Sequence, residues 1–178
     1  MTHMHPWAFR SRFRRDAFGW KGSKLAIERI HEALSEIRAL ARQDPATAAE
    51  GAVLLLERLS PALSRIDSSS GALGNATHAA VQQLVPLISG APVGTAVRMK
   101  WLDRLFRAIQ EDDPPYIESL GDHWGELCGT AEIASAWADR LLPTQRSVLH
   151  ERKRGTYAFF AGTTLCYSAL YEAGRQDK

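Results

Sequence analysis

Apolar residues recur every three or four positions along most of the chain, the spacing typical of helices that bury one face. Residues 23–41 show it first, with most charged side chains off the apolar stripe. We expect Ser23, which follows Gly22, to cap this helix. Its apolar stripe consists of Ile27, Ile30, Ala33, Leu34, Ile37, Leu40 and Ala41.

A second helix is predicted to begin after Asp44, which can cap it, because Pro45 fits the first helical position where no N–H is needed. Pro61 interrupts the apolar pattern, so we expect a kink or a break there. The short connection between the two helices predicts an antiparallel hairpin. The apolar positions of the second helix are Ala52, Leu55, Leu56, Leu59, Leu63 and Ile66.

The polar segment "DSSSG" at 67–71 separates this helix from the next one. That third helix is predicted to end at "GAP", residues 90–92, after Pro86 has bent its last turn. A fourth helix is predicted within 95–112 and stops at "DDPP", residues 112–115. We expect its buried face to consist of Val97, Trp101, Leu105 and Ile109, with Leu102 and Phe106 beside them.

Two further helices complete the predicted fold. Thr130 is expected to cap a helix over 131–142, whose stripe contains Ile133, Ala134, Trp137 and Leu141, and a last helix is predicted over about 156–173. Alternating strand patterns and hairpin turns are nearly absent. The sequence therefore predicts an all-α fold of six to seven helices, in which antiparallel helix pairs stack as a short α-solenoid-like arrangement or an irregular bundle.

The chain of 178 residues has the length of one domain, and 45% apolar and 24% charged residues are ordinary for a soluble globular protein. We expect residues 1–22 to form an N-terminal arm and residues 23–178 a single helical domain. Cys128 and Cys166 form no paired motif and no secretory signal is apparent, which favours the cytoplasm. Polar residues within 155–171 disfavour a membrane span, so no membrane partner is expected.

The chain has a net charge of +2, and its excess positive charge lies in the N-terminal arm, so the rest of the chain is near neutral. Its basic residues alternate with aromatic ones, a composition shared by contacts to single-stranded nucleic acid and by protein interfaces. A third interpretation docks the aromatic side chains on the first helix pair, with the arginines outward. The candidate contact residues are Arg10, Arg12, Arg14, Arg15, Trp20 and Lys21.

The segment "YIESLGDHWGELC", residues 116–128, contains the densest group of chemically active side chains. Asp122, His123 and Glu126 are candidates for binding a ligand or an anion. On a helix, Glu118 would share a face with Asp122 and His123 with Glu126. One histidine and one cysteine are too few for a metal centre. The alternative is a helix junction in which Leu120 and Trp124 fill the core, Asp122 caps and His123 bonds a carbonyl.

The "DSSSG" segment offers Asp67, Ser68, Ser69 and Ser70 at a predicted helix N-terminus, where backbone N–H groups favour anions. The same residues are ordinary helix caps. A serine nucleophile would need a histidine and an acid brought to it by the fold, and His78, Asp122 and His123 are the available residues.

Four strings together resemble a bacterial family of uncharacterised all-helical proteins with tetratricopeptide-like helix pairs. They are "FRRDAFGWKGSKLAI" at 13–27, "EGAVLLLERLSPALSRIDSSSGALG" at 50–74, "PPYIESLGDHWGELC" at 114–128 and "FFAGTTLCYSALYEAGR" at 159–175. The resemblance implies stacked helix pairs and brings no catalytic residue, substrate or cofactor. Members of that family continue beyond the last string, so we expect this chain to be an N-terminal part or a short member. A truncated stack would expose the aromatic residues of the 156–173 helix, through which copies could associate.

These observations favour a non-enzymatic helical module or scaffold that binds a protein partner, without a cofactor. The alternative is a small-ligand- or anion-binding domain, or a hydrolase-type enzyme, that uses segments 67–71 and 118–128. A weaker alternative is nucleic-acid binding through the basic arm.

Overall fold

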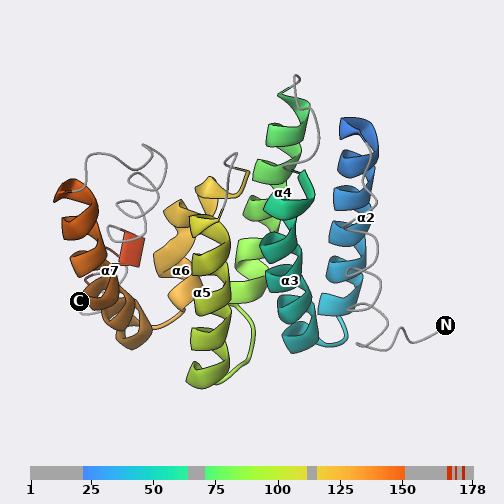
Figure 1. Cartoon of the computed structure of the whole chain (residues 1–178). Coiled ribbons are helices and arrows are strands. Elements are labelled where there is room, and N and C mark those ends of the chain that lie inside the picture. Colours follow the sequence, from blue (N-terminus) through green and yellow to red (C-terminus); the bar gives the residue numbers. More distant parts are fainter. Residues whose placement is uncertain are drawn as a thin grey trace.

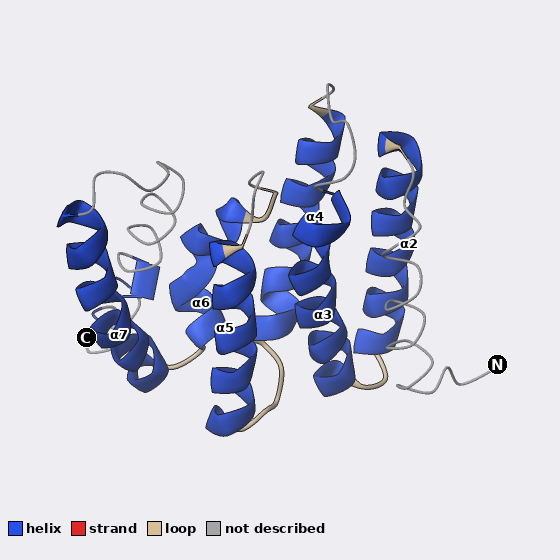
Figure 2. Cartoon of the chain, viewed as in Figure 1, coloured by secondary structure: helices blue, strands red, loops and turns tan. Residues whose placement is uncertain are grey.

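The computed structural model describes residues 22–63, 71–111 and 116–150 and, near the C-terminus, residues 168, 169, 171 and 174. Its elements are α2 (Ser23–Ala41), α3 (Pro45–Leu63), α4 (Ala72–Ser89), α5 (Thr95–Gln110), the 3-10 helix η1 (Glu118–His123), α6 (Trp124–Cys128) and α7 (Ala131–His150). Figure 2 shows only helices and connecting loops in this part of the chain. The prediction of an all-α fold is confirmed.

The helices pack in two layers (Figure 1). In one layer, α4 contacts α2 on one side and η1 and α6 on the other. In the second layer α3 contacts α5, while α3 also packs against α2 and α4 of the first. Helix α7 follows at the far end, against α6. Each of these helices thus contacts its next-but-one neighbour, as in a stack of antiparallel helix pairs.

The core between the layers is aliphatic near α2 and aromatic near α7. Ile30 and Ile37 of the predicted stripe are fully buried, while Ile27 is partly buried at its edge. At the other end, Trp124 and Trp137 meet edge to face, with ring centroids 5.1 Å apart, and Phe106 packs on Trp137 at 5.4 Å. Such aromatic contacts add to the hydrophobic stabilisation and join α5, α6 and α7.

Two of the predicted helix caps are present. The Thr47 backbone N–H donates to Asp44 Oδ1 at 3.0 Å, and the Thr47 hydroxyl donates to Asp44 Oδ2 at 2.5 Å. These hydrogen bonds, the side-chain one foremost, lower the pKa of Asp44. The Ile133 backbone N–H donates to Thr130 Oγ1 at 3.3 Å, so Thr130 caps α7.

Other local predictions are wrong. Ser23 is the first residue of α2, and Gly22, with φ of 87°, occupies the cap position without a side-chain hydrogen bond. A break at Pro61 does not occur, since α3 continues through this residue to Leu63, whereas the alternative of a kink there stays a prediction. The helix predicted over 131–142 extends to His150.

The register of the buried face of α5 also differs from the prediction. Val97 is 44% exposed, whereas the next residue, Arg98, is only 6% exposed. The Arg98 guanidinium turns inward because three backbone carbonyls accept its hydrogen bonds: Ile88 at 2.9 Å, Ala91 at 2.9 Å and Leu127 at 3.2 Å. Periodicity predicts burial of apolar residues and cannot anticipate an arginine that is satisfied in this way.

Arg98 therefore connects the C-terminal end of α4 to that of α6. A cation at these ends is favourable because the unpaired carbonyls make them the negative poles of the helix dipoles. Burial lowers the pKa of Arg98, and the nearby Cys128 opposes that shift. Gly129 completes the junction with φ of 75°, and an added Cβ would lie 3.2 Å from Arg98 Cζ. These contacts fix η1 and α6 beside α4.

Some predictions concern residues outside the described ranges. They include Ile66 on the second stripe, the "DDPP" stop at 112–115 and most of the 156–173 helix, of which residues 168, 169 and 171 are helical. Among the described residues, no helix combines the length and the apolar character needed to cross a membrane.

Candidate functional site

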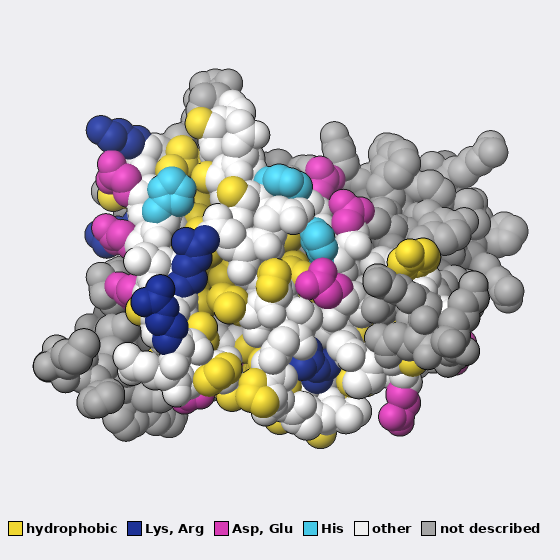
Figure 3. All heavy atoms as spheres, turned by 180° about the vertical axis from the view of Figure 1, so that it is seen from behind, with side chains coloured by type: hydrophobic (Ala, Val, Ile, Leu, Met, Phe, Trp, Pro, Cys, Tyr) yellow, Lys and Arg dark blue, Asp and Glu magenta, His cyan; other side chains and the backbone are white. Residues whose placement is uncertain are grey.

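The outward side of α4 is free of charged residues. None of its 18 residues is Lys, Arg, Asp or Glu. Figure 3 shows this layer from behind: uncharged and apolar side chains predominate in the centre, with histidines among them, a basic side chain lies below them, and most other charged side chains lie to either side. The outward residues, exposed or half-buried, form what we call the α4 face: Asn75, His78, Ala79, Gln82, Gln83, Pro86, Leu87 and Ser89.

A basic rim borders the α4 face on the side of α2. The Arg38 guanidinium donates a hydrogen bond to the Gln83 side-chain oxygen, which brings this strip of α2 against α4. Separations of fourteen and four residues are close to whole helical turns, so this strip carries one exposed carboxylate, Glu28, and is net basic because of the exposed Lys24, Arg38 and Arg42. We refer to these three residues as the basic rim. His31 lies among them and is also exposed.

An acidic rim borders the α4 face on the side of η1 and α6. His123 Nε2 lies 2.9 Å from Gln82 Nε2, and His123 Nδ1 lies 3.4 Å from Glu126 Oε2. The Ser89 hydroxyl donates to Glu126 Oε1 at 3.3 Å. Asp122 and Glu126 are exposed, and we refer to these two carboxylates as the acidic rim.

The conformation of segment 116–128 agrees in part with a helix junction. Leu120 and Trp124 are fully buried, as predicted for residues that fill the core. His123 contacts the Gln82 side chain rather than a carbonyl, and α6 has no side-chain cap, so both of those predictions are wrong. Since η1 has about three residues per turn, Glu118 and Asp122 do not share a face.

Ser168 joins the residues that hold this segment in place. Its hydroxyl accepts a hydrogen bond from the Gly125 backbone N–H at 2.8 Å and donates to the Asp122 carbonyl at 3.2 Å. One side chain thus bridges the end of η1 and the start of α6. No sequence signal connected Ser168 to this segment, because the contact spans more than forty residues of chain.

The structure therefore brings together Asp122, His123 and Glu126, and adds Gln82 and Ser89, which the sequence did not indicate. The remaining predicted site residues lie outside the described ranges. They are Asp67, Ser68, Ser69 and Ser70 of the anion segment and Arg10, Arg12, Arg14, Arg15, Trp20 and Lys21 of the arm.

The cluster does not have the geometry of an activated serine. The Ser89 hydroxyl donates to Glu126, while His123 contacts Glu126 and Gln82. In an activated serine, the hydroxyl donates to a general base and the acid orients that base. Here the serine hydroxyl donates directly to the acid instead. Within the described ranges, no group of three or more His, Cys, Asp or Glu residues could hold a metal ion.

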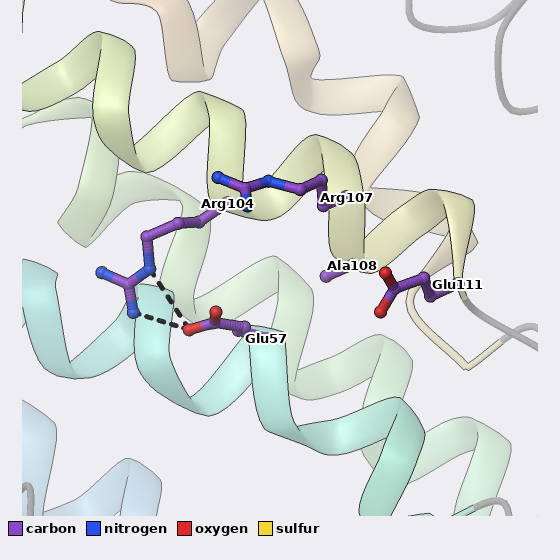
Figure 4. A pocket seen from close by; sticks show the side chains of 5 residues that line it. All are labelled: Glu57, Arg104, Arg107, Ala108 and Glu111. Carbon is purple, nitrogen blue, oxygen red and sulfur yellow. Dashed lines mark hydrogen bonds and ion pairs between the residues drawn. The ribbon is translucent and has the colours of Figure 1, made fainter.

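A hollow of about 150 Å³ lies between α3 and α5 (Figure 4). Arg104 Nη1 lies 2.7 Å from Glu50 Oε1, and its Nη2 lies 2.6 Å from Glu57 Oε2. Burial disfavours the charged form of Arg104, but bonding to these carboxylates outweighs it and raises the pKa of Arg104. The Trp101 indole N–H also donates to Glu50. The ion pairs of Arg104 with both carboxylates tie α3 to α5. The residues that line the hollow are Glu57, Arg104, Arg107, Ala108 and Glu111.

Comparison of the chain with known family models, with curated proteins and with solved structures gave no match. The resemblance to tetratricopeptide-like proteins therefore stays a prediction.

Proposed function

We propose that this protein is a non-enzymatic helical module that binds a protein partner through the α4 face. The observation that carries the proposal is the α4 face, the outward side of an 18-residue helix that contains no Lys, Arg, Asp or Glu, between the basic and the acidic rim. The centres of protein interfaces are depleted in charged residues, whereas their rims are polar. A fully solvated helix face ordinarily carries Lys, Arg, Asp or Glu instead.

The side chains on the α4 face suit a contact that forms and releases. Gln82 and Gln83 each contact a neighbouring helix, which limits the conformational entropy that they would lose on binding. The small Ala79 allows a partner backbone to approach between them.

The cluster of Asp122, His123 and Glu126 serves as the edge of this surface in our proposal. Its position beside α4, with Gln82 and Ser89 as hydrogen-bond partners, supports a role in orienting a partner's polar groups. The two widely spaced cysteines support placing the protein in the cytoplasm. Nucleic-acid binding by the arm stays a prediction about residues outside the described ranges.

The proposal is tested by photo-cross-linking in native cells. A photoreactive amino acid replaces Ala79 on the α4 face or, as the matched control, Gln110, which is exposed on α5 in the opposite layer. We expect one reproducible protein adduct from position 79 and none from position 110. Equal, diffuse labelling from both positions would contradict the proposal.

A further inference from the structure

We propose that the partner on the α4 face is a second copy of this chain, which forms a two-fold symmetric dimer. This inference rests on the proposed function, since it requires the α4 face to be an interface. Its additional basis is charge. The basic rim (Lys24, Arg38 and Arg42) and the acidic rim (Asp122 and Glu126) lie on opposite sides of an uncharged centre. A surface with this order is complementary to itself.

The order of the charges selects one orientation of the two copies. A two-fold axis parallel to α4 places the basic rim of each copy opposite the acidic rim of the other, so each attractive contact occurs twice. An axis across α4 would instead oppose basic to basic and acidic to acidic rims, which costs free energy. The inferred dimer therefore has its two α4 helices parallel, with each α4 residue opposite the same residue of the other copy.

The side chains at the rims are held in place before association. Arg38 is bound to Gln83, and Glu126 accepts a hydrogen bond from Ser89 and contacts His123. Both charged groups are therefore anchored to the helix at the centre of the surface. Anchored side chains lose less rotamer freedom when a partner covers them.

The dimensions of the surface predict a weak dimer. An 18-residue helix is about 27 Å long, and the axes of three adjacent helices span about 18 Å. The footprint is therefore roughly 500 Å² per copy, or about 1,000 Å² for both, which is the lower limit for specific interfaces. A concentration-dependent monomer–dimer equilibrium is expected rather than a permanent dimer.

Analytical ultracentrifugation of the purified full chain over a wide concentration range tests the inference. Arg38→Glu and Glu126→Arg should each weaken dimerisation at least about tenfold, because each reversal creates two like-charge contacts per dimer. The combined variant should recover most of the affinity. Arg107→Glu, an exposed arginine on α5, is the matched control and should leave dimerisation unchanged.

The outcomes separate this inference from the proposed function. Wild-type protein that stays monomeric at every concentration overturns the inference, as does a dimer that is insensitive to both reversals. If position 79 nevertheless cross-links to a different protein in cells, the proposed function stands without the dimer. Circular dichroism spectra of the variants show whether each one folds, and Ala79→Glu provides a second test by placing a charge at the uncharged centre.

Discussion

Replacing Arg98 by methionine tests whether the buried arginine holds the two layers in register. Methionine retains an unbranched side chain of similar length and removes the charge and all five N–H donors. Three carbonyls, those of Ile88, Ala91 and Leu127, lose a donor at once. The ends of α4 and α6 also lose the cation that faces both of them.

The expected loss follows from these contacts. Each of the three hydrogen bonds contributes about 1 kcal/mol net, and a cation at a helix C-terminus adds up to about 1 kcal/mol. This loss is partly offset, because burying a methionine costs much less desolvation free energy than burying the guanidinium, whose burial lowers the pKa of Arg98. We therefore expect Arg98→Met to lower the free energy of unfolding by roughly 2–4 kcal/mol, and the melting temperature by about 5–15 °C.

Urea unfolding followed by far-ultraviolet circular dichroism measures this loss. Arg107→Met is the matched control, because Arg107 is exposed on the same helix and donates only one long hydrogen bond, of 3.3 Å, to the Asp103 carbonyl. The control should change the free energy of unfolding by less than about 0.5 kcal/mol. If Arg98→Met were as stable as wild type or more so, desolvation of the guanidinium would outweigh its hydrogen bonds and the reasoning would be refuted.

Substitutions at Gly129 and Asp44, each with a matched comparison, test the helix ends. Gly129→Ala should lower the free energy of unfolding by roughly 1–2 kcal/mol, because Gly129 has φ of 75° and a Cβ would press on Arg98. Gly74 is helical and faces open space, so Gly74→Ala should raise the free energy of unfolding by about 0.5–1 kcal/mol. Equal effects of the two substitutions in urea titrations would argue against a strained position 129. Asp44→Ala should lower the melting temperature at neutral pH, whereas Asp44→Asn should retain the cap to Thr47. Since folding lowers the pKa of Asp44, the ionised carboxylate contributes stability above the ordinary carboxyl range, and that contribution is lost as the pH falls through the lowered value. The melting temperatures of wild type and Asp44→Asn should therefore converge as the pH falls through the lowered pKa of Asp44, and parallel pH profiles would refute the assignment.

The helices were predictable from the sequence because their signals are local. Asp44 with Pro45 marks the start of α3, and Thr130 marks the start of α7, whatever the rest of the chain does. The stripe of α2 is buried at Ile30 and Ile37, as its spacing predicts. Each of these features depends on residues within about two turns of one another.

Two of the errors concern residues whose environment is decided by distant parts of the chain. Whether Val97 or Arg98 faces inward depends on carbonyls contributed by α4 and α6, which no pattern within α5 reveals. The same holds for His123, whose partner Gln82 lies 41 residues earlier in the chain. Segment 118–123 is a 3-10 helix of about three residues per turn, so the four-residue spacing of Glu118 and Asp122 does not place them on one face.

One property of the candidate surface, its lack of charged residues, can be recognised in the sequence by counting them. The absence of Lys, Arg, Asp and Glu from residues 72–89 is visible without coordinates, but in the sequence it indicates only an apolar helix. The structure adds that Asn75, Ala79, Gln82 and Pro86 face outward, so the uncharged character belongs to an exposed surface. The rims on either side come from other helices and could not be predicted.

Site-directed disulfide cross-linking between copies tests most directly whether the α4 faces of two chains meet with their helices parallel. The variants are Asn75→Cys and Pro86→Cys, near opposite ends of the outward strip of α4, with wild type as the control for Cys128 and Cys166. Under mild oxidation, each variant alone should form a disulfide-linked dimer faster than wild type, and a mixture of the two should yield few mixed dimers. Mixed dimers in excess would show antiparallel helices, and cross-linking at the wild-type rate from both positions would show that the α4 faces do not meet.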